Sequence, residues 1–183
     1  MIPMIIKRSF EKKYLEEFVY GAIDGTVTTF AVVAGVMGAS LSSVIVLILG
    51  FANLFADAFS MAISNYLAIK SENDLMAKHK HRHEHIKNPR KTAIATFFSF
   101  VIIGFIPLIS FVLAVFIPSL RANQFSYSIA LTALAFIIIG IAKARVTERN
   151  IFKSVFEIIL IGGAAAIIAF VVGFFLRNLI GNA

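Results

Sequence analysis

Residues 43–69 read SVIVLILGFANLFADAFSMAISNYLAI, and Asp57 is the one charged side chain in this run. A helix of about 20 apolar residues crosses the hydrocarbon core of a bilayer. The run lacks the alternation of apolar and polar residues that marks the strands of a membrane barrel. It therefore predicts a transmembrane helix over residues 43–69.

Four further apolar runs accompany this helix, at residues 20–41, 92–117, 125–142 and 155–176. Of the 183 residues, 59% are hydrophobic and 15% are charged, and the mean hydropathy is +0.89. A soluble domain carries about a quarter of charged residues, because water must wet its surface. The sequence therefore predicts an all-α membrane protein with five transmembrane helices, forming a single domain over residues 20–183.

The basic residues indicate how the chain is oriented in the membrane. Of 17 Lys and Arg residues, all but Arg121 and Arg177 lie before the first run, between the second and third, or between the fourth and fifth. Cytoplasmic loops carry the excess of basic residues, so we expect a cytoplasmic N-terminus and a C-terminus outside. Because the net charge of +7 is spread over these loops and not over a groove, no nucleic-acid partner is expected. Residues 1–6 are too short for the hydrophobic part of a signal peptide, so the first helix is expected to direct insertion.

Local signals refine the ends of these helices. Residues 10–18 mix Lys, Glu and aromatic side chains at helical spacing, so residues 1–19 are predicted to form an amphipathic segment at the membrane interface. Residues 39–43 predict a tight corner between the first two helices. Pro107 should kink the third helix, and Pro118 should end it.

Five helices cannot form the two equal halves of an inverted-repeat transporter. Any path for a solute is therefore expected between two copies of the chain, in a homodimer with the path on its two-fold axis. The last helix also carries a stripe of small residues, which we expect to pack inside one protomer. This stripe consists of Gly162, Ala166, Ala169 and Gly173.

Two carboxylates lie inside the predicted spans. Asp24 is near the cytoplasmic end of the first helix, and Asp57 is in the middle of the second. A charged side chain at mid-membrane costs roughly 2.5–3.5 kcal/mol even on insertion scales, and it usually marks a functional site. The alternative interpretation is structural, with each Asp hydrogen-bonded to a neighbouring helix.

Polar side chains extend along the same two helix faces. Thr28 follows Asp24 by one turn, and Asn53, Asp57 and Met61 recur every four residues. Carboxylate, amide, hydroxyl and thioether groups together suit Fe²⁺ or Mn²⁺ better than Mg²⁺ or Ca²⁺. Met61 alone would be ordinary core packing, and its place one turn from Asp57 favours a role as ligand. The predicted metal-path residues are Asp24, Thr28, Asn53, Asp57 and Met61, with the metal as transported substrate and no cofactor.

Every histidine of the chain lies in the predicted cytoplasmic loop 71–88. If the second helix continues into this loop, the histidines form two i, i+4 pairs that could each chelate a metal. Interleaved Lys and Arg oppose such binding, so a solvated basic face or a pH-responsive segment is the alternative. The candidate residues for metal capture are His79, His81, His83, His85 and Glu84.

Two long motifs resemble those of the vacuolar iron transporter family. They are GAIDGTVTTF at 21–30, followed by VAGV at 33–36, and GFANLFADAFSMA at 50–62. Shorter matches follow in order, at 88–89, 104–107, 140, 143–144, 147 and 161–166. The resemblance implies five spans and a homodimer whose first two helices line a path, with proton-coupled export or sequestration of Fe²⁺ or Mn²⁺. Asp24 and Met61 match positions that the family uses in the path.

The chain departs from the family at two places. The family has Gly-Glu-Tyr where this chain has Ser64, Asn65 and Tyr66, so a carboxylate is lost that bears on metal preference and proton coupling. The Glu-rich cytoplasmic insert of the family is also missing, because residues 71–88 are too few to form it. This compactness favours a prokaryotic plasma membrane, with a vacuolar membrane as the alternative.

Other functions stay open at this stage. Polar stripes suit a passive channel or a carrier of another solute equally well, and a membrane scaffold without transport is a further alternative. An enzyme is not expected, because the spans hold no nucleophile beside a base. The chain has no cysteine, which excludes disulfides and thiolate metal sites.

Overall fold

The computed structural model describes residues 2–78 and 87–181, with side chains over 14–77 and 87–181, and every regular element in this part of the chain is helical. The elements are α1 (Ile2–Gly38), α2 (Ser43–Lys78), α3 (Pro89–Gly104), η1 (Ile106–Leu108), α4 (Ile109–Phe116), η2 (Pro118–Asn123), α5 (Gln124–Thr147) and α6 (Ile151–Ile180).

Five helical segments of the described chain are long and apolar enough to cross a membrane, as the sequence predicts. They cover Tyr14–Gly38, Ser43–Ala77, Pro89–Phe116, Pro118–Thr147 and Ile151–Ile180. Each begins at or before the corresponding apolar run, and the second, fourth and fifth also end beyond it, because a helix continues into polar sequence until a breaker ends it. Helix α1 likewise runs without a break from Ile2, so residues 2–19, which belong to the predicted amphipathic segment, continue directly into the first span.

The third span is interrupted at the predicted proline. Helix α3 ends at Gly104, and a single 3₁₀ turn that contains Pro107 separates it from α4. Proline lacks the backbone N–H that would continue the helical hydrogen bonds. The Ser128 hydroxyl of α5 donates a 2.6 Å hydrogen bond to the carbonyl of Pro107, which gives this buried carbonyl a partner at the break.

The corner between α1 and α2 is as short as predicted. Ser40 adopts a left-handed conformation with φ of 54°. Its N–H donates to the carbonyl of Met37, and the N–H of Leu41 donates to the carbonyl of Val36. This pair of bonds satisfies the last carbonyls of α1 and turns the chain directly into α2.

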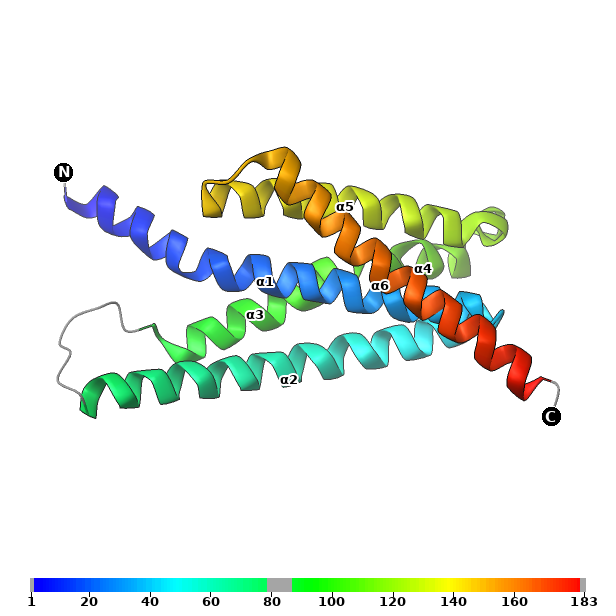
Figure 1. Ribbon diagram of the computed structural model, residues 1–183, viewed down its shortest axis with the longest axis horizontal. Coiled ribbons are helices and arrows are strands. Elements are labelled where there is room, and N and C mark those ends of the chain that lie inside the picture. Colours follow the sequence, from blue (N-terminus) through cyan, green and yellow to red (C-terminus); the bar gives the residue numbers. More distant parts are fainter. Residues whose placement is uncertain (1, 79–86, 182–183) are drawn as a thin grey trace.

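Helix α1 lies at the centre of the bundle and contacts α2, α3, α5 and α6 (Figure 1). Glycines allow its closest approaches: a Cβ at Gly25 would lie 2.6 Å from the carbonyl oxygen of Phe100 in α3. A Cβ at Gly173 of α6 would lie 2.1 Å from the carbonyl oxygen of Gly35. Gly162 packs in the same way against the ring of Phe136 in α5. The small-residue stripe of the last helix therefore packs inside the protomer, as predicted.

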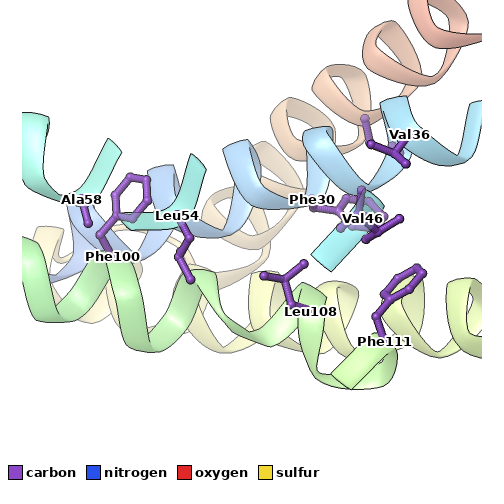
Figure 2. Close-up of a cluster of buried hydrophobic side chains, with 11 residues drawn as sticks. Phe30, Val36, Val46, Leu54, Ala58, Phe100, Leu108 and Phe111 are labelled. Atoms are coloured by element: carbon purple, nitrogen blue, oxygen red, sulfur yellow. The ribbon is translucent and has the colours of Figure 1, made fainter. Parts of the chain in front are cut away.

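The main apolar core joins α1, α2, α3 and α4 (Figure 2). Phe30, Leu54, Phe100, Leu108 and Phe111 lie in it, each nearly or wholly buried. By contrast, most apolar side chains of α2 and α6 point outward. Such an exterior is what a bilayer solvates, and water would not.

The bundle has two ends that differ in charge. Helix α1 begins at the end where α2 meets α3 and where α5 meets α6, and α6 finishes at the opposite end (Figure 1). Successive spans run in opposite directions. The stretches rich in Lys and Arg, which precede the first span, join the second to the third and join the fourth to the fifth, therefore belong to one end of the molecule. That this end is cytoplasmic stays a prediction from the positive-inside rule.

Candidate functional site

The tight corner brings Asp24 and Asp57 to the same depth in the bundle. Asp24 precedes the end of α1 at Gly38 by 14 positions, and Asp57 follows the start of α2 at Ser43 by 14. In an antiparallel hairpin, equal distances from the corner place two residues level with each other. Both side chains are half-buried, and they belong to two neighbouring helices that contact each other. The structure therefore unites the two intramembrane charges that the sequence singles out.

Asp57 is held by a neighbour on its own helix. The side-chain amide of Asn53 donates a 2.8 Å hydrogen bond to Oδ2 of Asp57, one turn along α2. The other carboxylate oxygen is not used in this contact, and neither is the carbonyl oxygen of the Asn53 side chain. These two oxygens are acceptors of the kind that bind divalent cations.

Thr28 and Met61 flank the two carboxylates. The hydroxyl of Thr28 donates a 2.9 Å hydrogen bond to the backbone carbonyl of Asp24, so its oxygen lone pairs are not consumed. Met61 is half-buried and packs against the edge of the main core. Its thioether therefore serves core packing, whatever else it does.

Asn65 of α2 points toward a different neighbour. Its side-chain amide donates a 2.8 Å hydrogen bond to the hydroxyl of Thr96 in α3. Thr96 is fully buried, and its own hydroxyl proton goes to the carbonyl of Thr92 at 3.0 Å. Asn65 thus ties α2 to α3.

The described chain brings only two charged candidate ligands together. Among the side chains that the structure describes, no three His, Cys, Asp or Glu residues gather in a way that could hold a metal ion. Asp24 and Asp57 provide two carboxylates, and the remaining candidates Thr28, Asn53 and Met61 are neutral. Two like charges close together in a low-dielectric site attract a divalent cation strongly. The predicted loop ligands, the four histidines and Glu84, lie outside the described residues.

Sequence reasoning missed one buried carboxylate. Glu17 of α1 is only 8% exposed, and it pairs with Lys87 just before α3 at 2.7 Å. It lies two helical turns before Asp24, on the same side of α1. The seven-residue spacing is visible in the sequence, but the contact joins residues 70 positions apart and needed the fold.

The chain matches a family model described as the VIT family over residues 15–88 and 76–174. It is 30% identical to "Vacuolar iron transporter 1" of Eucalyptus grandis, over 85% of this chain and 84% of that protein. It is 32% identical to "Vacuolar iron transporter homolog 1" of Arabidopsis thaliana, over 93% of this chain and 84% of that protein. For "Vacuolar iron transporter" of Plasmodium berghei the identity is 38%, but the match spans 42% of this chain and 28% of that protein.

Proposed function

The chain belongs to the VIT family, and from this premise we propose that it carries a divalent transition metal, Fe²⁺ or Mn²⁺, out of the cytoplasm in exchange for protons. The observation that supports this proposal best is the pair of intramembrane carboxylates, Asp24 and Asp57, at one level of the α1–α2 hairpin. An ion that enters a medium of low dielectric constant needs fixed opposite charge to replace its hydration shell.

The ligand set would be completed by a second copy of the chain. Helix α2 exposes small side chains at every fourth position, on the surface beside Asp57, and lipid alone gives them no close packing partner. They are Ala52, Ala56, Ser60 and Ser64. Small residues at this spacing let helices approach closely in lipid. A homodimer built on this surface would double each carboxylate around a two-fold axis.

The neutral ligands would adjust metal preference. The free side-chain oxygen of Asn53 is a hard ligand, and the thioether of Met61 is a softer one. Exchange of one divalent cation for two protons would leave the charge of the site unchanged, which is why carboxylates suit an antiporter. With the basic end of the bundle in the cytoplasm, the metal would leave through the end where α1 meets α2.

Two membranes are candidates for the location of this protein: the vacuolar membrane and the plasma membrane of a prokaryote. The names of the relatives refer to the vacuole, and the predicted orientation would serve export into that compartment. The lack of a Glu-rich insert between α2 and α3 favours instead the plasma membrane of a prokaryote. The transport direction relative to the cytoplasm is the same in both.

A structural role for Asp57 is the competing proposal, and one contact favours it. The hydrogen bond from Asn53 gives this carboxylate a partner inside the protomer. If both Asp residues served only such bonds, the chain would be a scaffold. A passive channel, or a carrier of another solute, would use the same polar faces without coupling to protons.

Transport by the purified protein in liposomes would test the proposal. We expect uptake of Fe²⁺ and Mn²⁺ that rises with an imposed pH gradient and is accompanied by proton movement in the opposite direction. Asp24→Asn keeps the shape and removes the charge, so uptake should fall to that of empty liposomes while the protein stays folded. Uptake without proton movement would indicate a channel. An unchanged rate in folded Asp24→Asn protein would overturn the proposed path.

A further inference from the structure

Lys87 is placed between two carboxylates of the first helix. Its ammonium group lies 2.7 Å from Oε1 of Glu17 and 3.3 Å from Oε2 of Glu16. The backbone around Lys87 is held as well: the side-chain amide of Asn73 in α2 donates to the Lys87 carbonyl at 3.0 Å. Helix α1, the last part of α2 and the segment just before α3 therefore meet at this lysine.

Glu17 is the buried member of the pair. It is 8% exposed, and its second oxygen, Oε2, has no hydrogen-bond partner among the described residues. A buried carboxylate oxygen without a donor is costly, because it has lost water and gained nothing in return. Among the described residues, neither Lys87 nor any other donor uses this oxygen, so it could bind a second cationic group.

Lys87 carries its charge at any physiological pH. Burial lowers the pKa of Lys87, but the hydrogen bonds and charges of Glu17 and then Glu16 outweigh it, so the pKa lies above its usual value. Loss of the proton therefore cannot release the contact in a cell. A competing cation, a proton taken up by the glutamates, or a movement of the segment that holds Lys87 can do so.

The position of Glu17 relates it to the central site. Glu17 and Asp24 are seven residues apart, which is two turns and about 10.5 Å along α1, with nearly the same direction from the helix axis. A cation that leaves Glu17 toward the interior would next meet the carboxylate of Asp24. Lys87 stands at the basic end of this line, where the ion would come in from the cytoplasm.

We propose that Glu17 and Glu16 form an entrance site for a divalent cation, and that Lys87 occupies this site as a tethered cation until the metal displaces it. This inference rests on the proposed transport function for its biological meaning, but the site itself is defined by binding. With Lys87 in place, the two carboxylates keep one uncompensated negative charge, and a divalent ion in its place would neutralise both. Lys87 therefore sets the metal concentration at which the entrance fills.

Binding of Mn²⁺ to purified protein, followed by electron paramagnetic resonance, would test this directly. The measurements use a background with both Asp24→Asn and Asp57→Asn, which removes the two carboxylates of the central site and leaves the entrance. There, Lys87→Gln should tighten Mn²⁺ binding by about tenfold, because the ion no longer competes with a paired ammonium group. The matched control is Lys70→Gln, which removes an exposed positive charge from the last part of α2, at the same end of the bundle as Lys87. It should change the Mn²⁺ affinity by less than about twofold.

The role of Glu17 is tested by a double variant. Glu17→Gln combined with Lys87→Gln should lose the gain, because the ion's main ligand is missing. Lys87→Arg keeps the charge and pairs more firmly with carboxylates, so Mn²⁺ should bind more weakly than to the parent. This variant decides the question if Lys87→Gln does not fold.

Two outcomes would overturn the entrance site: equal affinities in Lys87→Gln and Lys70→Gln, or a gain that persists without Glu17. A failed transport assay leaves these binding results standing, so the two proposals can fail separately.

Discussion

The side-chain amide of Asn65 donates its hydrogen bond to a hydroxyl that has no proton left to give. Thr96 accepts from Asn65 at 2.8 Å and donates to the carbonyl of Thr92 at 3.0 Å. A carboxylate at position 65 would therefore face an acceptor. The contact with α3 therefore requires a donor at position 65, which the amide of Asn65 supplies.

Asn65→Asp should destabilise the protein. The ionised side chain would place an acceptor against the buried oxygen of Thr96, and an unmatched buried polar group costs about 1–3 kcal/mol. Because a protonated carboxyl could still donate, the loss should grow as the pH rises. Thermal unfolding of purified protein in detergent, at mildly acidic and mildly alkaline pH, measures this. Asn65→Ala, which removes the donor without adding charge, is the control and should cost less; an Asp variant as stable as the parent would contradict the assigned contact.

Most of the fold could be predicted from the lengths of the apolar runs. The five spans and the break at Pro107 follow from hydrophobicity and from the missing N–H of proline. The extension of α2 to Lys78 could not be read in this way, because residues 70–78 are polar. The absence of Gly and Pro from residues 51–88 lets the helix continue past its apolar part.

The candidate site was predictable only where its contacts are local. The contact of Asn53 with Asp57 joins residues one turn apart. That Asp24 lies at the same depth as Asp57 follows from the short corner between α1 and α2. By contrast, the pairs Asn65–Thr96 and Glu17–Lys87 depend on how α3 is rotated and placed against α1 and α2. A pattern of spacing along single helices contains no information about that rotation.

The orientation of the chain gives a second prediction. Because the basic residues gather at one end of the bundle, a reporter fused after Ala183 should behave as extracytoplasmic, and one inserted near Lys80 as cytoplasmic. An enzyme reporter pair that is active on opposite sides of the membrane measures this. Both reporters on the same side would contradict the five-span orientation.

Asp57→Asn separates a structural role from a role in transport. An Asn at this position keeps an oxygen that can accept the bond from Asn53, so the protein should stay folded and elute as a single species. Transport should nevertheless fall by about tenfold or more, because half of the protomer's charge at the site is removed. The control Asn53→Ala removes the donor and keeps the charge, and it should retain most of the transport. Full transport by Asp57→Asn would assign this carboxylate to structure alone.

Met61→Leu tests whether the thioether selects the metal. Leucine nearly conserves the volume that packs against the main core, so stability should change by less than about 1.5 kcal/mol. Because sulfur favours the softer ion, its removal should lower the rate for Fe²⁺ more than for Mn²⁺ and shift their ratio by about threefold. Initial uptake rates for the two metals in the same liposomes give this ratio without correction for protein amount. Met37→Leu is the matched control, since Met37 is also half-buried against the main core but lies near the far end of α1. If both variants change the ratio equally, or neither changes it, Met61 is a core residue and the metal is selected by oxygen ligands alone.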